Sequence, residues 1–310
     1  MNQLIKVNPP FKYIGGKSWL QKELSILVKK QLQKKTNIDT YCEPFCGGLG
    51  AFLNIYHVLL ENNIKHIILN DINSNMINLY KYIANDIDTV IENMQTLELL
   101  FENTIDIEKV KKTKSKDELK LLLKKANEFF LEQRKIFNKN KRQLNQDQAV
   151  KFLFLQKHSF NGIYRENGKG EYNSPFNWSE KIINEDYIKN LYNLNHLFNK
   201  FKINFTNISF EDIEYSRNML VYLDPPYINL DIQENSYNKN RFGLIEQKKL
   251  IQLIKNSTFI YSNHNHQDIL NEFNVQKITI NTEIISRSNL ISAKADSRKN
   301  KKEELLIHSF

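Results

Sequence analysis

Residues 38–77 alternate short apolar runs with turns. The stretch TYCEPF at 40–45 predicts a strand, GGLGAFLNIYHVLL at 47–60 a turn and a helix, and KHIILNDI at 65–72 a second strand. A strand, a helix and a strand in this order favour parallel pairing. The same texture returns after residue 200, where KINFTNISF and NMLVYLDPPY predict two further strands.

The last part of the chain continues this pattern. FIYSNH, KITINTEII and EELLIHSF predict three strands, and EQKKLIQLIKNS predicts a helix between two of them. The middle differs, because strand signals are few and SKDELKLLLKKANEFFLEQRKIF places apolar residues at helical spacing with a charged outer face. We therefore expect an α/β fold with a Rossmann-like sheet formed by 1–77 and 186–310, and a helical insert over 78–185.

Composition narrows the classes of protein. With 310 residues, 41% hydrophobic and 25% charged, the chain is long enough for a large core and is not globally disordered. We see no apolar run of membrane-spanning length and no signal peptide, so we expect a cytoplasmic protein with no membrane partner. The net charge of +9 favours an anionic partner such as nucleic acid. Cys42 and Cys46 fit ordinary small core residues.

A glycine-rich turn, Glu43 to Gly50, follows the first strand and opens a helix. Glycine permits a tight turn and the close approach of a ligand to the backbone. Asp71 lies 24 residues after Gly47, near the spacing of about 20 at which an acid binds ribose hydroxyls in dinucleotide folds. The pattern indicates either a nucleoside site or a plain turn with a surface Asp.

The sequence Asp224-Pro225-Pro226-Tyr227 directly follows an apolar strand. Two prolines end that strand, and the carboxyl ends of strands carry the ligands in open α/β sheets. The Asp224 carboxylate and the Pro225 carbonyl form a rigid pair of acceptors that suits both N–H bonds of an exocyclic base amine. Such acceptors would localise the nitrogen lone pair, and Tyr227 would stack on the base. The alternative is a Pro-Pro turn with a helix-capping Asp.

These motifs in this order resemble the Dam-like (alpha-class, D12-type) DNA adenine N6-methyltransferases. The resemblance covers nearly the whole chain and rests on FKYIGGKSWL at 11–20, YCEPFCGGLGAF at 41–52, ILNDIN at 68–73, FNGIYRENGKGEYNSPF at 160–176, YLDPPY at 222–227, YSNH at 261–264 and KKEELL at 301–306. It implies a Rossmann-like S-adenosylmethionine-dependent methyltransferase sheet with an inserted target-recognition subdomain. The implied activity is site-specific transfer of methyl to adenine N6 in double-stranded DNA.

The resemblance also implies the cofactor-binding residues for S-adenosyl-L-methionine. They are Tyr13, Lys17, Glu43, Phe45, Gly47, Asp71, Ser209, Phe210 and Asp224. The catalytic residues implied are those of the loop itself, Asp224, Pro225, Pro226 and Tyr227. The proposed chemistry needs no metal, and His264 is interpreted as a structural residue.

For DNA, the resemblance implies a reading hairpin around 158–176. The DNA-binding residues implied are Lys12, Phe160, Asn161, Ile163 and Arg165. Arg165 would read a guanine with two bonds, and Phe160 would fill the gap left by a flipped-out adenine. Candidates for phosphate contacts are Lys169, Arg287, Lys294, Arg298 and Lys299. The alternative is a surface hairpin held by Asn-Gly turns.

Three other functions stay open at this point. A cytosine-N4 methyltransferase or an RNA methyltransferase would use the same acceptor logic, and a catalytically silent DNA-binding module would retain only the recognition surface. GATC is the default recognition site that the resemblance implies. A single chain acting alone, a monomer, is the expected working form, and a cognate restriction endonuclease is a partner that the family admits.

Overall fold

The computed structural model describes residues 6–13, 15–34, 37–178, 183–227, 242–264, 267–288 and 301–310. The chain divides into two compact units. The sheet unit comprises residues 23–46, 55–72 and 208–310, and the helical unit comprises residues 1–22, 47–54 and 73–207.

The described strands form one seven-stranded sheet with the order β3-β2-β1-β4-β5-β7-β6. They are β1 (Thr40–Glu43), β2 (His66–Asn70), β3 (Lys202–Thr206), β4 (Met219–Leu223), β5 (Thr258–His264), β6 (Asn281–Ser288) and β7 (Lys301–His308). β1 pairs in parallel with β2 and β4, β4 pairs in parallel with β5, and β7 is antiparallel to β5 and β6. This mostly parallel sheet confirms the predicted α/β fold class.

The predicted strand that begins at Lys277 starts later, at Asn281. Lys277 has a φ of 56°, and the N–H of Ile278 donates to the carbonyl of Phe273. These are the features of a left-handed helix end, which closes the preceding helix α11 (Gln267–Val275). The chain must complete this turn before it can extend, and the strand is therefore displaced toward the C-terminus.

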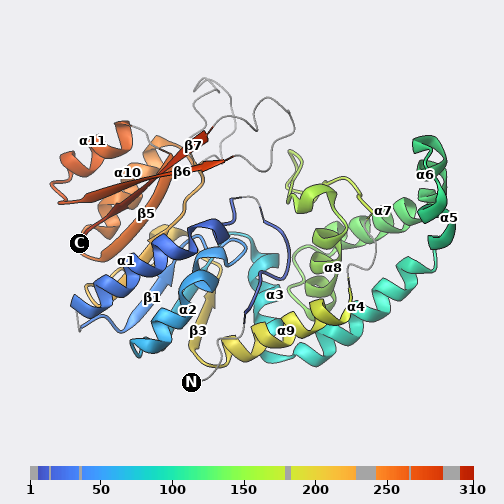
Figure 1. The fold of residues 1–310 in the computed structure, drawn as a ribbon, viewed down its shortest axis with the longest axis horizontal. Coiled ribbons are helices and arrows are strands. Elements are labelled where there is room, and N and C mark those ends of the chain that lie inside the picture. Colours follow the sequence, from blue (N-terminus) through green and yellow to red (C-terminus); the bar gives the residue numbers. More distant parts are fainter. Residues whose placement is uncertain are drawn as a thin grey trace. The chain divides into compact units, whose positions relative to one another are not determined.

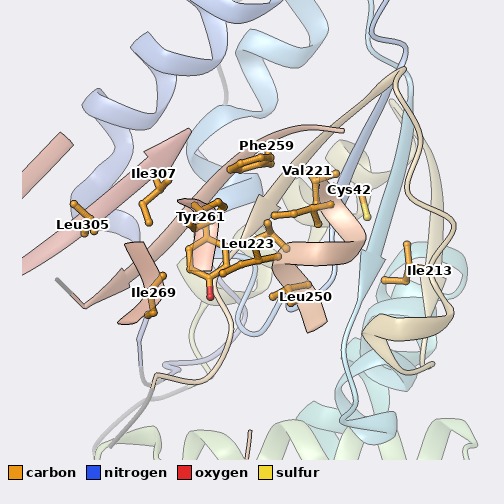
Figure 2. Close-up of a cluster of buried hydrophobic side chains, with 13 residues drawn as sticks. Cys42, Ile213, Val221, Leu223, Leu250, Phe259, Tyr261, Ile269, Leu305 and Ile307 are labelled. Atoms are coloured by element: carbon orange, nitrogen blue, oxygen red, sulfur yellow. The ribbon is translucent and has the colours of Figure 1, made fainter. Parts of the chain in front are cut away.

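The sheet unit buries a continuous apolar core between β4, β5 and β7 and the helices α10 (Leu244–Ile254) and α11. Val221 and Phe259 come from the strands, while Leu250 and Ile269 come from the helices (Figure 2). Four of the five residues of β4 are buried, so both faces of that strand are covered. This explains why the strand reads as an uninterrupted apolar run and not as an alternating one.

The helical unit contains the helices of the middle of the chain (Figure 1). They are α3 (Ser74–Asn85), α4 (Ile87–Glu102), α5 (Ile107–Lys112), α6 (Lys116–Leu122), α7 (Lys124–Lys139), α8 (Gln146–Lys157) and α9 (Glu185–Phe198). Helix α8 contacts α3, α4 and α7, and its apolar residues are buried nearly all round. Helices α1 (Gln21–Lys34) and α2 (Gly50–Glu61) come before β2 in the chain.

The long helical run predicted over 115–137 is broken at Leu123, which lies between α6 and α7. Helix α6 buries no residue, and Leu121 is 71% exposed. Helix α7 buries Ala126, Phe130 and Phe137. Only the second part of the run therefore has a core to pack on, and most helical stability comes from such packing.

None of the helices in the described ranges has the length and apolar character needed to cross a membrane. The same residues contain no group of three or more His, Cys, Asp or Glu side chains placed to hold a metal ion.

We expect Lys157→Met to stabilise the protein at neutral pH. Burial, and then the nearby charge of Lys12, lower the pKa of Lys157 to about 8, although its Nζ lies 3.9 Å from the centroid of the Tyr187 ring. Below pH 8 the lysine is charged in both the folded and the unfolded state, so the folded state bears the full free-energy cost of burying the ammonium. Between pH 8 and the ordinary pKa of 10.5 the unfolded state binds more protons, and that cost disappears.

The variant should gain about 1–2 kcal/mol in free energy of unfolding at pH 7, after the loss of the cation–π contact. This gain should shrink between pH 8 and pH 10.5. Urea denaturation across that range measures it, with the exposed Lys125→Met as the control. A gain that is the same at every pH would contradict the assigned pKa.

Candidate functional site

The carboxyl ends of the parallel strands place three acidic residues along one edge of the sheet unit. Glu43 ends β1 and is paired with Leu69 of β2, and Asp71 follows β2. Cys42 is paired with Val221, so Asp224 follows the end of the neighbouring strand β4. The strand order reverses between β1 and β4, and in open α/β sheets ligands bind at such a switch point.

Asn70 holds the loops at this edge together. Its side-chain amide donates to the carbonyls of Pro44 at 3.0 Å and Ile208 at 3.1 Å, and its Oδ1 accepts from the N–H of Ile208 at 3.0 Å. Its own carbonyl accepts from the N–H of Cys46 at 2.8 Å. The segments that carry Phe45 and Ser209 are thus tied to the end of β2. Sequence reasoning missed Asn70, although a buried amide directly before Asp71 was a signal.

Three phenylalanine rings gather at the same edge. The centroid of Phe45 lies 5.6 Å from that of Phe210 and 5.4 Å from that of Phe242, and Phe210 and Phe242 are 5.3 Å apart. Ser209 caps the short helix that begins at Phe210, because its hydroxyl accepts from the N–H of Glu211. Phe242 was not predicted, since nothing in the polar stretch before it marks one aromatic residue as part of a site.

Glu43 and Asp71 are both largely withdrawn from water, with 1% and 9% of their surface exposed. The hydroxyl of Tyr41 donates to Glu43 Oε1 at 2.7 Å, and burial followed by the charge of Glu43 raises the pKa of Tyr41. Burial also raises the pKa of both Cys42 and Cys46, which are free and buried. This agrees with their interpretation as core residues.

The Asp-Pro-Pro-Tyr loop is hydrogen-bonded to the buried side-chain amide of Gln247. The side chain of Gln247 donates to the carbonyl of Pro226 at 3.0 Å, and its oxygen accepts from the hydroxyl of Tyr261. Asp224 itself is half-buried and Pro226 is exposed. Gln247 was missed, yet a glutamine three and four residues before Leu250 and Ile251 lies on the apolar face of its helix, and that was a detectable signal.

Tyr227 is anchored by the antiparallel part of the sheet. Its hydroxyl donates to Glu304 Oε1 at 2.6 Å, and its ring centroid lies 4.4 Å from that of His264. His264 was interpreted as a structural residue, and the structure places it against the ring of the predicted catalytic tyrosine.

In the helical unit, the N-terminal segment packs on the glycine turn. A Cβ on Gly47 would lie 2.9 Å from the Tyr13 ring, and one on Gly48 would lie 2.6 Å from Tyr13 Cβ. The hydroxyl of Tyr80 donates to the carbonyl of Gly47 at 2.6 Å. Lys17 is 3% exposed, and its ammonium donates to the carbonyl of Gly15. Tyr13 therefore lies against Gly47, the backbone of Lys17 lies against Gly50 of the same turn, and only glycine admits the approach of Tyr13.

The predicted DNA-reading residues occupy a hairpin that projects from α8. Antiparallel bridges join Ser159 to Phe176 and Glu166 to Tyr172. Phe160 is 51% exposed, and Arg165 is exposed with its Nε donating to Asn173 Oδ1 at 3.3 Å. Asn161 and Ile163 lie between them, Asn161 exposed with a left-handed φ of 57° and Ile163 half-buried.

Side chains from helix α7 fix this hairpin. Asn138 donates to the carbonyl of Tyr172 at 3.0 Å and accepts from its N–H at 2.9 Å, and Arg134 donates to the carbonyl of Ser174 at 3.1 Å. The hydroxyl of Ser174 donates to the carbonyl of Ile163 and accepts from the N–H of Arg165. A continuous set of hydrogen bonds thus runs from α7 to Arg165.

The amino-acid sequence is similar to known proteins over nearly its whole length. The family described as D12 class N6 adenine-specific DNA methyltransferase matches residues 13–297. The chain belongs to this family. It is 31% identical to the Type II methyltransferase M.MjaIII of Methanocaldococcus jannaschii, over 99% of this chain and 100% of that protein. It is 27% identical to the DNA adenine methylase of Escherichia coli K12, over 97% of this chain and 95% of that protein.

Membership of the D12 class confirms the predicted family and a methyltransferase that acts on DNA. The DNA adenine methylase of Haemophilus influenzae is 27% identical over 84% of this chain and 80% of that protein. The roles of individual site residues stay predictions. Among the phosphate candidates, Lys169 is exposed on the hairpin. Lys294, Arg298, Lys299 and the side chain of Arg287 lie outside the described residues.

In this D12-class methyltransferase, we expect Gly162→Ala to destabilise the hairpin. Gly162 is buried with a φ of +64°, and an added Cβ would lie 2.7 Å from Lys12 Cβ and 3.1 Å from the Lys12 carbonyl oxygen. The left-handed backbone and the overlap should together cost about 2–4 kcal/mol. Gly168 of the same hairpin, where an added Cβ meets nothing within 4 Å, provides the matched control Gly168→Ala. Urea denaturation compares the two, and equal stabilities would refute the contact.

Proposed function

We propose that this protein transfers a methyl group from S-adenosyl-L-methionine to adenine N6 at a short site in double-stranded DNA. The observation that carries the proposal is the alignment of Glu43, Asp71 and Asp224 along the carboxyl edge of the parallel strands, on both sides of the switch point. GATC is the site that we propose as the starting hypothesis.

The described residues at this edge fit S-adenosylmethionine. Asp71, a largely buried carboxylate at the end of β2, suits the two ribose hydroxyls. The rings of Phe45, Phe210 and Phe242 offer an apolar aromatic surface for the adenine. The largely buried carboxylate of Glu43, which accepts from the Tyr41 hydroxyl, suits the amino group of the methionine part, because a cation beside a buried carboxylate offsets the cost of burying its charge.

The remaining cofactor residues that we propose, Tyr13, Lys17 and Gly47, belong to the helical unit. Tyr13 supplies an aromatic ring and Lys17 a cation, while Gly47 keeps the turn open for that ring. When bound, S-adenosylmethionine supplies an electrophilic methyl group.

Asp224 and Pro225 carry the chemistry that we propose for the target amine. The Asp224 carboxylate accepts one N–H of the amine and the Pro225 carbonyl accepts the other, which localises the lone pair on nitrogen. Gln247 engages the next carbonyl, that of Pro226, and so fixes the direction in which the loop presents Pro225. The carboxylate also stabilises the positive charge that develops on nitrogen.

Tyr227 supplies the surface on which the target base stacks. A base inside a duplex cannot reach Asp224, so we propose that the adenine is flipped out, at a cost of a few kcal/mol. Stacking on the tyrosine ring, worth about 1–3 kcal/mol, offsets part of that cost.

The hairpin carries the reading of the DNA sequence in this proposal. Arg165 donates to guanine O6 and N7 through N–H groups other than the Nε–H bound to Asn173. The exposed ring of Phe160 fills the gap that the flipped base leaves. Asn161, Ile163 and Lys12 contact neighbouring bases, and Gly162 holds Lys12 beside them.

We expect Asp224→Ala to lower methyl transfer by a factor of about 100 or more, as the removal of one preorganised electrostatic group does in other enzymes. Labelled cofactor with duplex DNA measures the rate, and thermal unfolding shows that the fold survives. The matched control is Asp117→Ala on helix α6, which should be as active as the wild type.

The identity of the product tests the function itself. Mass spectrometry of nucleosides should show N6-methyladenine from duplex DNA. N4-methylcytosine, or a methylated product from RNA alone, would overturn the adenine assignment. Binding of DNA without any binding of S-adenosylmethionine would favour a catalytically silent DNA-binding module, and full activity in the Asp224 variant would remove that residue from the mechanism.

We expect Arg165→Ala to relax the choice of site more than it weakens cofactor binding. Loss of a two-bond contact to guanine costs about 1–3 kcal/mol of discrimination at one base position. Lys169→Ala, on the same hairpin, should weaken binding evenly across sequences. Long-read sequencing of DNA from cells that express each variant maps the modified sites, and an unchanged preference in the Arg165 variant would contradict its role.

A further inference from the structure

We propose that Glu304 is a positioning residue that sets the plane of the Tyr227 ring for stacking on the target base. The inference rests on the proposed function, because it concerns the base-stacking surface of that same site. It adds Glu304 to the proposed site, a residue that lies 77 positions after Tyr227 in the sequence.

Glu304 accepts two hydroxyl groups on one carboxylate oxygen. The Tyr227 hydroxyl and the Ser262 hydroxyl both donate to Oε1, each at 2.6 Å, and the two hydroxyl oxygens are 3.3 Å apart. Glu304 is 6% exposed and Ser262 is fully buried. Two hydroxyl donors that converge on one buried carboxylate oxygen give the end of the Tyr227 side chain a defined position.

The register of the sheet brings a second contact to the same ring. β5 and β7 are antiparallel, and His264 is the direct partner of Glu304 in this ladder. Side chains of direct partners lie on the same face of a sheet. Glu304 binds the Tyr227 hydroxyl while the His264 ring packs against the Tyr227 ring at 4.4 Å and an interplanar angle of 64°. The cross-strand pair of Glu304 and His264 therefore contacts both the hydroxyl and the aromatic ring of Tyr227.

The hydroxyl of Tyr227 serves as an anchor and not as an acid. Burial, followed by the charges of Asp224 and Glu304, raises the pKa of Tyr227 far above its ordinary value. The phenol thus stays protonated and continues to donate to Glu304. The hydroxyl therefore contributes by orienting a neutral ring. Stacking is favoured when the orientation of that ring is fixed before the base arrives.

A double-mutant cycle separates positioning from a merely structural role. The variants are Tyr227→Phe, which keeps the ring and removes the hydroxyl, Glu304→Ala, and the two together. If Glu304 acts through the hydroxyl, the single variants should each lower the single-turnover methylation rate by about 10-fold, and the double variant should be no slower than the slower single one.

The spectroscopic readout is a DNA duplex with 2-aminopurine at the target position. Stacking on Tyr227 should quench its fluorescence in the wild-type complex, and the Tyr227→Phe and Glu304→Ala variants should show the same weaker quenching. The affinity for S-adenosylmethionine should change less than two-fold in all of them. Glu283→Gln on the neighbouring strand β6 is the control and should keep the wild-type rate.

Multiplicative effects of the two substitutions would overturn the proposal, as would a wild-type rate in Tyr227→Phe beside a slow Glu304→Ala. If Glu304→Ala does not fold, Glu304→Gln retains the volume and one weaker acceptor, and it should slow the wild type by two- to five-fold but leave Tyr227→Phe unchanged. A wild-type protein that methylates no adenine would refute the proposed function itself, whereas an active wild type with independent effects refutes only the role of Glu304.

Discussion

The parallel pairing of β1 with β4 is the constraint on which the site depends. The strand order reverses between these two strands, so the loops that follow them diverge and leave the edge between them open. Their register pairs Cys42 with Val221, so Glu43 at the end of β1 and Asp224 just after β4 lie along the same edge of the sheet. A shift of β4 by one residue would move Asp224 along the edge and turn the side chains of β4 to the opposite faces of the sheet. The apolar side chains of β4 would then leave the core of the sheet unit, so this core protects the geometry of the site.

Uncharged polar side chains hold the functional loops in place. Asn70 binds the loops after β1 and before Ser209, Gln247 binds Pro226, and Asn138 binds Tyr172 in the hairpin at 158–176. Asn70 and Asn138 use both the donor and the acceptor of the amide to replace hydrogen bonds that a loop backbone lacks, and Gln247 uses its donor for this. Amides do this without adding charge, so they do not compete with Glu43, Asp71 and Asp224 for a cationic or polar ligand.

In the helical unit, glycine residues allow neighbouring segments to approach the backbone of the predicted site closely. Gly47 and Gly48 let the Tyr13 ring lie against the backbone, and Gly162 lets Lys12 lie against the hairpin. Tyr13 and Lys12 are neighbours in the chain, so one short N-terminal segment contacts both the glycine turn and the hairpin at 158–176. This arrangement joins the parts of the helical unit that the proposed function assigns to the cofactor and to DNA.

The sequence by itself determined the fold class, the strands and the motif residues. Strand and helix periodicities are local, and the Asp-Pro-Pro-Tyr loop and the glycine turn show their chemistry in a few adjacent residues. The break at Leu123 and the late start of β6 escaped it, because packing and a left-handed helix end decide them. Only the tertiary structure brought Phe242 to Phe45, Ser174 to Arg165 and Glu304 to Tyr227. An ordinary residue gains a role at a site through its partner, and pairings between distant segments are set by strand register and helix packing, which no local pattern encodes.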